Sequence, residues 1–224
     1  MKSVLVVGGG FAGVAAATAL AESGVQVTLL EARGHLGGRA SSSSPADSFP
    51  APFDNGPHLF MGCYSETLRL LARMGAEKDL KWIDPLKIQW LLPEGREVSL
   101  NCLPLPSPWH LASGLLFSNA FPFSEKNTLA DALQSLRNSS STSNSSFMTV
   151  ENFLTLTGQG PTVRDRFWIP FTRAVLNLSP REAPLALLAT VIRRVFFGSR
   201  FNSSFGIARR PLGDLLFPSV QGWL

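Results

Sequence analysis

The chain of 224 residues has few of the residues that build metal centres or disulfide frameworks. It contains two cysteines, Cys63 and Cys102, and three histidines, His35, His58 and His110. The cysteines have no paired spacing, so no disulfide framework is expected and a reduced, cytoplasmic setting is the default. None of these side chains lies at metal-ligand spacing from another, so no metal is expected. No Ser-His-Asp or Cys-His set has supporting context, and no catalytic residue is singled out.

Long hydrophobic runs are also missing. No stretch of about eighteen uninterrupted apolar residues occurs, so a membrane-spanning helix is not expected. Hydrophobic residues make up 45% of the chain and charged residues 16%, as in a globular protein of one or two domains. The net charge is only +4, but residues 161–210 carry nine arginines against Asp165 and Glu182. This stretch is either a solvated basic face or a surface that attracts anionic lipid or a diphosphate. No nucleic-acid motif accompanies the arginines, so a nucleic-acid partner is not expected.

What the chain does have is a glycine pattern near its start. A short apolar run, residues 4–7, is followed by Gly8, Gly10 and Gly13 at G-x-G-x-x-G spacing. An alanine-rich segment and a second apolar run come next, and Glu31 ends that run 23 residues after Gly8. A strand, a glycine turn, a helix, a second strand and a terminal acid form the fingerprint of a dinucleotide-binding βαβ unit. The pattern predicts an α/β fold with a Rossmann-like unit at its start.

Each residue of the fingerprint has a physical reason. Gly8 allows the tight turn out of the strand, Gly10 lets a pyrophosphate approach the backbone, and Gly13 lets the helix pack closely on the sheet. The helix start offers unpaired N–H groups and the positive end of its dipole to phosphates. Glu31 is placed to accept hydrogen bonds from ribose hydroxyls, which favours FAD or NAD over NADP. The alternatives are a buried hairpin or a secretory signal, since Met1 and Lys2 precede apolar residues. Three consecutive glycines would interrupt such a signal.

The residues after Glu31 indicate which dinucleotide is bound. Residues 31–39 read E-A-R-G-H-L-G-G-R, which resembles the E-x-R-x-x-x-G-G-R extension of the FAD-dependent amine oxidase and phytoene desaturase superfamily. In that family the second glycine turn and its arginine lie along the flavin nucleotide's phosphates. Residues 54–58, D-N-G-P-H, resemble the family's D-x-G-x-H segment, which runs past the flavin ring. The resemblance makes FAD the expected cofactor and NAD the alternative. The predicted cofactor-binding residues are Gly8, Gly10, Phe11, Ala12, Gly13, Glu31, Ala32, Arg33, Gly37, Gly38, Arg39, Gly56, Pro57 and His58.

Two further segments resemble a narrower group. Residues 54–64 are similar to the GxHxxxGxY stretch of squalene-associated FAD-dependent desaturases. Residues 167–183 are similar to that group's W-x-P-[LF]…A-x-L-N-x-x-P-x-x-A segment. These proteins are hydroxysqualene dehydroxylases of hopanoid biosynthesis. The resemblance implies that a reduced flavin delivers hydride to the allylic cation left when hydroxysqualene loses its hydroxyl, which gives squalene. A long isoprenoid substrate needs a long apolar cavity, and the aromatic stretches at 110–123 and 167–171 are candidates to line it.

The remaining pattern predicts individual elements. A helix is expected over residues 10–22, apolar nearly all round and therefore buried. A second helix follows from Ser65 and stops at Gly75, and a β-hairpin covers residues 86–100. The stretch 110–123 is expected to be a core helix or the wall of a lipid-facing tunnel. Helix starts are expected at Thr128, Thr149 and Ser179, and loops at 41–52 and 138–146.

The domain prediction is a FAD-binding segment over residues 1–75 and part of an α+β substrate domain over residues 76–224. Superfamily members are roughly twice this length and return late in the chain to the nucleotide domain, so the chain is expected to be truncated, with that return missing. Three functions stay open: dehydroxylation of hydroxysqualene, desaturation of a carotenoid precursor such as phytoene or zeta-carotene, and nucleotide binding without turnover. The expected location is the cytoplasm, with peripheral attachment to the inner membrane face as the alternative.

Overall fold

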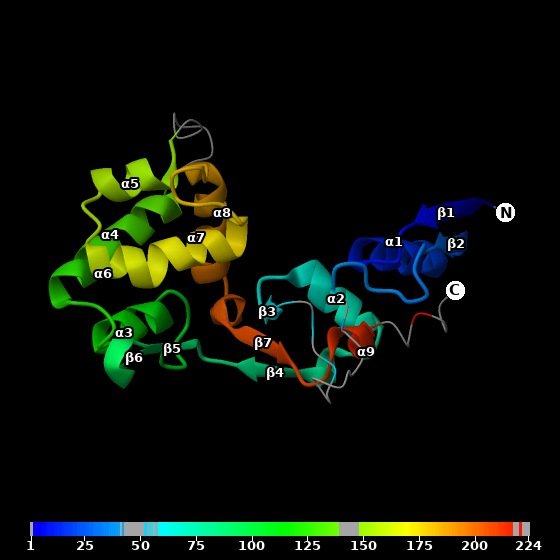
Figure 1. Cartoon of the computed structure of the whole chain (residues 1–224), viewed down its shortest axis with the longest axis horizontal. Coiled ribbons are helices and arrows are strands. Elements are labelled where there is room, and N and C mark those ends of the chain that lie inside the picture. Colours follow the sequence, from blue (N-terminus) through cyan, green and yellow to red (C-terminus); the bar gives the residue numbers. More distant parts are fainter. Residues whose placement is uncertain are drawn as a thin grey trace. The chain divides into compact units, whose positions relative to one another are not determined.

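The computed structural model describes residues 2–40, 42, 52, 54, 56, 58–138, 148–216 and 220. These residues form two compact units (Figure 1). Unit 1 is drawn from residues 1–82 and 205–224, and unit 2 from residues 83–204. Most of the two segments predicted as loops, 41–52 and 138–146, lies outside the described residues. In the described part of the chain, no helix is long and apolar enough to cross a membrane.

Unit 1 begins with the predicted strand–helix–strand unit. Strands β1 (Ser3–Val7) and β2 (Gln26–Leu30) pair in parallel, with Ser3 opposite Gln26. Helix α1 (Phe11–Glu22) connects them, and its Val14 and Ala17 are fully buried. The α/β class and the helix bounds are thereby confirmed. The expected burial holds for one side of this helix, whereas the small side chains on its other side, Ala12, Ala16 and Ala19, are exposed.

The end of the described chain returns to unit 1, which corrects the predicted domain division. Strand β7 (Phe205–Ala208) lies between β3 (Leu59–Met61) and β4 (Leu80–Ile83) in a three-stranded sheet. Helix α9 (Leu212–Leu216) places Leu212 and Leu215 in one core with Val14 and with Leu71 of helix α2 (Ser65–Arg73). Hydrophobic burial does not depend on how far apart two residues are in the sequence. Residues 205–216 therefore pack in unit 1 and not in a domain that starts at residue 76.

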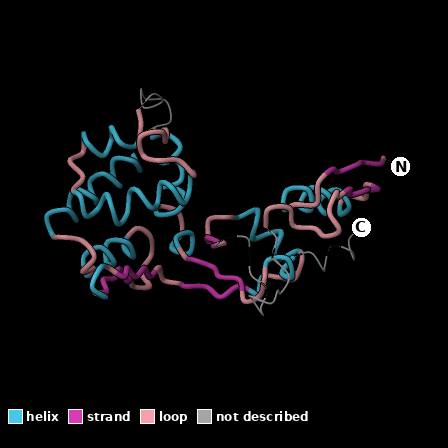
Figure 2. The backbone as a smooth tube through the Cα atoms, in the orientation of Figure 1, coloured by secondary structure: helices cyan, strands magenta, loops and turns pink. Residues whose placement is uncertain are grey.

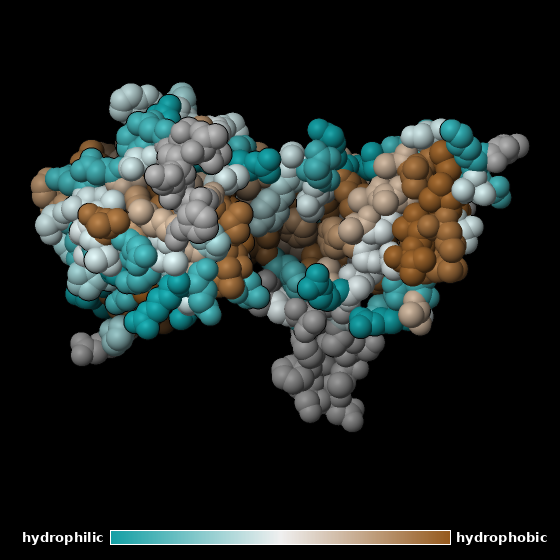
Figure 3. All heavy atoms as spheres, turned by 90° about the horizontal axis from the view of Figure 1, so that it is seen from above, coloured by the Kyte–Doolittle hydropathy of each residue, from teal (hydrophilic) through white to brown (hydrophobic). Residues whose placement is uncertain are grey.

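The β1–β2 pair leaves apolar side chains exposed. Val4, Leu5, Val7 and Leu30 are all exposed, and Figure 3 shows hydrophobic residues gathered at the end of unit 1 near the N-terminus. Parallel sheets normally have both faces covered by other elements. This end of unit 1 therefore presents more apolar surface than a covered parallel sheet does.

Unit 2 is mostly helical (Figure 2). It opens with the predicted hairpin, in which β5 (Lys87–Leu91) and β6 (Glu97–Asn101) pair antiparallel around the 3₁₀ turn η2 (Pro93–Gly95). Its other elements are α3 (Trp109–Phe117), α4 (Phe123–Asn138), α5 (Val150–Leu156), α6 (Pro161–Val163), the π-helical turn η4 (Arg164–Trp168), α7 (Ile169–Leu176), α8 (Leu185–Phe196) and the 3₁₀ turn η5 (Arg200–Ser203). In unit 1, a further 3₁₀ turn, η1 (Glu77–Asp79), precedes β4.

The three predicted helix starts have different outcomes. Thr149 caps α5, since its hydroxyl accepts a hydrogen bond from Asn152 N at 3.2 Å, and this prediction is confirmed. Thr128 lies inside α4, where its hydroxyl donates to the carbonyl of Glu125, and the predicted start there is wrong. That helix begins earlier because the carbonyl of Pro122 accepts hydrogen bonds from Glu125 N at 3.0 Å and Lys126 N at 3.1 Å, which closes the first helical turn before Thr128.

The predicted start at Ser179 is also wrong, although its local hydrogen bond forms. Ser179 Oγ and Glu182 Oε2 lie 2.6 Å apart, as in a capping box, but α8 begins only at Leu185. Val150 N donates to Ala183 O at 2.9 Å, and Pro184 forms a bridge with Thr149. This pairing holds residues 183–184 extended, so the turn after Ser179 cannot continue into the helix.

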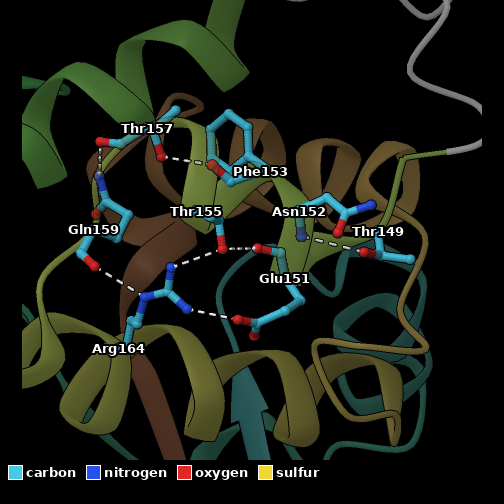
Figure 4. Close-up of polar contacts among 8 residues, drawn as sticks. All are labelled: Thr149, Glu151, Asn152, Phe153, Thr155, Thr157, Gln159 and Arg164. Atoms are coloured by element: carbon cyan, nitrogen blue, oxygen red, sulfur yellow. Dashed lines mark hydrogen bonds and ion pairs between the residues drawn. The ribbon is translucent and has the colours of Figure 1, made fainter.

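Arg164 of η4 makes three polar contacts, two of them with α5 (Figure 4). Its guanidinium lies 2.6 Å from Glu151 Oε1 and donates to Gln159 O at 2.9 Å and to Thr155 Oγ1 at 3.2 Å. Glu151 and Thr155 are one helical turn apart and therefore present one face of α5 to Arg164. Gln159 in turn accepts from the fully buried Trp168 at 2.8 Å, so the contacts connect to the core.

Replacing Arg164 by methionine should lower the free energy of unfolding by about 1–2 kcal/mol, because the hydrogen bonds are lost while the aliphatic packing is kept. The matched control is Arg69→Met, because Arg69 forms an ion pair at an exposed site. The side chains of Arg69 and Glu66 are 73% and 77% exposed, whereas those of Arg164 and Glu151 are 23% and 34% exposed. The control should stay within about 0.5 kcal/mol of the wild type. Urea unfolding followed by circular dichroism measures both, and equal losses would contradict a structural role for the Arg164 contacts.

His110 is a fully buried histidine at the start of α3. Its Nε2 lies 3.1 Å from Ser203 Oγ, and within the described residues its Nδ1 has no hydrogen-bond partner. Burial lowers the pKa of His110 below its ordinary value of 6.5, because a charged imidazole would lose its hydration. The folded state therefore keeps this ring neutral at pH values where the unfolded chain already binds a proton.

The stability of the fold should consequently fall as the pH drops below about 6.5, with a slope of up to about 1.4 kcal/mol per pH unit from this group. Above that pH the ring is neutral in both states and contributes no slope. Urea unfolding at pH 7.5, 6.5 and 5.5, values chosen to bracket the ordinary pKa, measures the effect. His110→Gln should be less stable throughout but should lose this part of the slope, whereas replacing the exposed His35 by glutamine should keep it. An unchanged slope in the His110 variant would refute the assignment.

Candidate dinucleotide site

The site starts at the turn between β1 and α1. Gly8 has a φ of +101°, a left-handed conformation that favours glycine, and its N–H donates to Leu30 O at 2.7 Å. Gly10 precedes α1 in an extended conformation with no side-chain cap on the helix start. A Cβ on Gly13 would lie 1.8 Å from Gly8 O, so the helix can pack on this turn only with glycine at position 13. Phe11 and Ala12 form the start of the first helical turn.

Glu31 lies beside this turn, at the carboxyl end of β2. Its Oε1 accepts a hydrogen bond from Arg33 N at 2.9 Å and its Oε2 accepts one from Gly9 N at 2.7 Å. These backbone hydrogen bonds, Arg33 first and Gly9 second, lower the pKa of Glu31 below its ordinary value. The side chain is therefore an ionised acceptor at neutral pH, held in place by the backbone of the glycine turn itself.

The second glycine turn contacts the first. Gly37 N donates to Gly9 O at 2.8 Å, and Gly10 and Gly37 form an isolated parallel bridge. A Cβ on Gly38, whose φ is +59°, would lie 3.3 Å from the Cα of Gly10, so the two turns touch through their backbones. Around them, Arg33 Nη1 donates to Gly38 O at 3.2 Å, and Ala32 and Arg39 are exposed. The structure thus brings together the two motifs that the sequence separates.

The third predicted segment is held by other contacts. Gly56 N donates to Asp54 O at 2.7 Å, and His58 leads into β3 with a buried Nδ1 that has no partner in the described part of the chain. Pro57, also predicted as a site residue, lies outside the described residues. This segment is held in unit 1 by β3, which pairs antiparallel with β7.

Sequence reasoning missed what Asp54 does. Its Oδ1 accepts hydrogen bonds from Leu212 N at 2.9 Å and from Ser42 Oγ at 2.6 Å, and Ser42 Oγ accepts one from Gly213 N at 3.0 Å. Asp54 and Ser42 therefore satisfy N–H groups at the start of α9, which have no partners within that helix. Asp54 accepts a helix-start hydrogen bond as an N-cap residue does, but it lies 158 residues before Leu212 in the sequence. No local sequence pattern predicts such a contact.

The residues present fit a dinucleotide. A Cβ on Gly10 would make ordinary van der Waals contact with the second glycine turn, since it would lie 3.9 Å from both Gly37 O and Gly38 Cα, so the backbones of the two turns meet here with no side chain between them. The first N–H groups of α1 point out of a helix start with no side-chain cap, which suits a phosphate. The ionised Glu31 beside them suits a ribose hydroxyl. Among the described residues, no group of three or more His, Cys, Asp or Glu side chains could hold a metal ion.

The comparison with known families agrees with this geometry. The model of the flavin containing amine oxidoreductase family matches residues 11–213. The chain belongs to this family. Its cofactor is accordingly a flavin, FAD, and the NAD alternative is set aside.

Relatives of this amine oxidoreductase family member include named desaturases. The chain is 26% identical over 224 residues to 15-cis-phytoene desaturase of an Oncidium hybrid cultivar, covering 97% of this chain and 38% of the relative. It is 38% identical over 77 residues to zeta-carotene desaturase of Solanum lycopersicum, covering 34% and 13%. The chain thus spans well under half the length of these relatives.

Solved structures show the same fold. A putrescine oxidase superposes with a TM-score of 0.64 at 17% identity, covering 99% of this chain and 49% of that one. An oxidoreductase from Methanosarcina mazei superposes with a TM-score of 0.62 at 16% identity, covering 100% and 50%. At these identities the likeness concerns the fold alone.

Proposed function

We propose that the protein is an FAD-dependent oxidoreductase acting on a long isoprenoid, and that its reaction is the dehydroxylation of hydroxysqualene to squalene. The observation that carries the flavin part is the contact between the two glycine turns, with the ionised Glu31 bonded to Gly9 N at 2.7 Å. The substrate part is supported by residues 167–183, whose pattern resembles the hydroxysqualene dehydroxylases of hopanoid biosynthesis.

Desaturation of a carotenoid precursor is the second candidate. It is supported by the alignment with a phytoene desaturase over 97% of this chain and by several zeta-carotene desaturases over about a third of it. The two candidates share a long apolar polyene as substrate but differ in the bond that changes. Dehydroxylation exchanges a hydroxyl for hydride, whereas desaturation removes two hydrogens.

The chain's own residues would bind and orient in either reaction. Flavin, when bound, would supply the hydride chemistry, and the glycine turns and Glu31 would hold its nucleotide. In unit 2, Phe167 and Phe171 stack with ring centroids 5.4 Å apart, and Phe171 lies 5.4 Å from Phe196. Phe167 and Phe171 are half-buried and remain candidates to contact an apolar substrate. Trp168 is fully buried and bonded to Gln159, so it belongs to the core of unit 2 rather than to a substrate surface.

Visible absorbance of the purified chain before and after addition of FAD tests the flavin part. Bands near about 370 and 450 nm that stay with the protein through gel filtration are expected. Anaerobic incubation with reduced flavin and hydroxysqualene should then give squalene, and incubation of the oxidised form with phytoene should give no product. A desaturated product from phytoene would favour the second candidate. A folded chain that stays colourless with excess FAD would favour a nucleotide-domain piece without turnover.

A further inference from the structure

The outward side of α3 is apolar and exposed. Trp109 is 66%, Leu116 62% and Phe117 73% exposed. These residues are spaced seven and eight positions apart, which places them on one side of a helix. An exposed helix normally presents polar and charged side chains to water. Residues 110–123 were predicted to be a core helix or the wall of a lipid-facing tunnel, and for this side of the helix the core alternative is wrong.

The opposite side of α3 is already packed. His110 and Ser113 are buried there, and a Cβ on Gly114 would lie 2.6 Å from Cys102 Sγ and 3.1 Å from Leu100 Cδ2. Because the helix lies this close to the hairpin, it cannot rotate to bury its outward side. The exposed face is therefore a fixed feature of unit 2.

The apolar surface continues beyond the helix. Leu103 and Leu105 before α3 and Phe123 after it are exposed. Residues 98–124 contain no Asp, Glu, Lys or Arg. Exposed large apolar side chains gathered on and around one helix, with no charged residue among them, mark a candidate surface for a partner or a membrane. We refer to Leu103, Leu105, Trp109, Leu116, Phe117 and Phe123 as the α3 patch.

A lysine lies at the C-terminal end of α3, and the helix joined to its other end carries an exposed arginine. At the C-terminal end, Lys126 Nζ donates to Leu116 O at 3.0 Å and to Ser118 O at 2.7 Å. At the other end, Ser107 Oγ donates to Phe196 O at 3.1 Å, which joins the start of α3 to the end of α8, a helix whose last turn also carries the exposed Arg194. A nearby acid, Asp84, is paired with Arg200 at 3.1 Å and adds no net negative charge.

We propose that the α3 patch is a membrane-docking surface that lies in the headgroup region of an anionic bilayer. Tryptophan and phenylalanine favour that interface, and flanking lysine and arginine attract anionic headgroups. The choice of a lipid occupant over a protein rests in part on the proposed function, since a long isoprenoid partitions into bilayers. The contact is peripheral, because α3 has nine residues and is too short to span.

Vesicle co-sedimentation of the purified chain tests this surface without flavin or substrate. The wild type should bind vesicles of phosphatidylcholine mixed with phosphatidylglycerol more tightly than vesicles of phosphatidylcholine alone. Leu116→Ser with Phe117→Ser should weaken binding about tenfold or more, because two large side chains no longer enter the interface. The matched control is Leu156→Ser with Leu187→Ser, two exposed leucines in α5 and α8. Circular dichroism verifies that both variants fold.

Quenching by brominated lipid gives an independent measurement. Tryptophan fluorescence of the wild type should be quenched when the protein binds these vesicles. Trp109→Phe should lose most of that quenching but should still co-sediment with vesicles as the wild type does. Equal binding by the two double variants, or no binding to anionic vesicles, would overturn the proposal. A dimer in solution that only the α3-patch variant dissociates would assign the surface to a second copy instead. Since none of these measurements involves FAD, a failure here leaves the proposed function untouched.

Discussion

Replacing Gly10 by valine should abolish FAD binding in a chain that still folds. The backbone at Gly10 has a φ of −76°, which any residue adopts, and a Cβ there would meet no atom closer than 3.9 Å. The protein itself therefore accommodates a Cβ at this position, whereas a larger side chain at this turn would hinder the close approach of a pyrophosphate to the helix start. We expect affinity for FAD to fall about 100-fold or more for valine and about tenfold for alanine, as lost phosphate hydrogen bonds would require.

Flavin titration followed by fluorescence gives the dissociation constants, and urea unfolding gives the stabilities. The matched control is Gly34→Ala, in the same part of unit 1, where an added Cβ meets nothing within 4 Å. That variant should bind FAD as the wild type does. If a folded Gly10→Val protein bound FAD with wild-type affinity, the glycine turn could not be part of the cofactor site.

Replacing Gly13 by alanine should instead unfold or strongly destabilise unit 1. The added Cβ would lie 1.8 Å from Gly8 O and 3.0 Å from Gly8 C, both backbone atoms that cannot move aside without parting α1 from the turn. Overpacking of this kind costs about 3 kcal/mol or more when backbone must shift. The loss should appear in unit 1, because Val14 of the same helix is part of its core.

Hydrogen exchange read by mass spectrometry locates the effect. Peptides from α1, β1 and β2 should lose protection in Gly13→Ala, while peptides from α4 and α8 in unit 2 keep theirs. In Gly13→Ala, FAD binding should be lost together with the fold of unit 1. In the Gly10 variants, by contrast, FAD binding should be weakened while the fold is kept. Full protection in α1 with an intact Gly13→Ala protein would contradict the close packing at this turn.

The sequence alone determined the features whose causes are local. The order of β1, α1 and β2, the spacing of Gly8, Gly10 and Gly13, the terminal acid Glu31 and the hairpin at 87–101 were all predictable. Each depends on neighbours within about thirty residues, through periodicity, glycine conformation or turn chemistry. The FAD prediction belongs here too, since it rests on motifs within residues 8–58.

Only the tertiary structure decided the features whose causes lie far apart in the chain. Residues 205–216 return to unit 1 because Leu212 and Leu215 find their apolar partners there, and Asp54 caps their helix across 158 residues. Ser179 has a capping pattern but no helix, because Ala183 and Pro184 pair with residues 149 and 150. An apolar stretch such as α3 predicts burial but not which of its sides is covered. Packing between distant segments settles that, and residue spacing does not encode it.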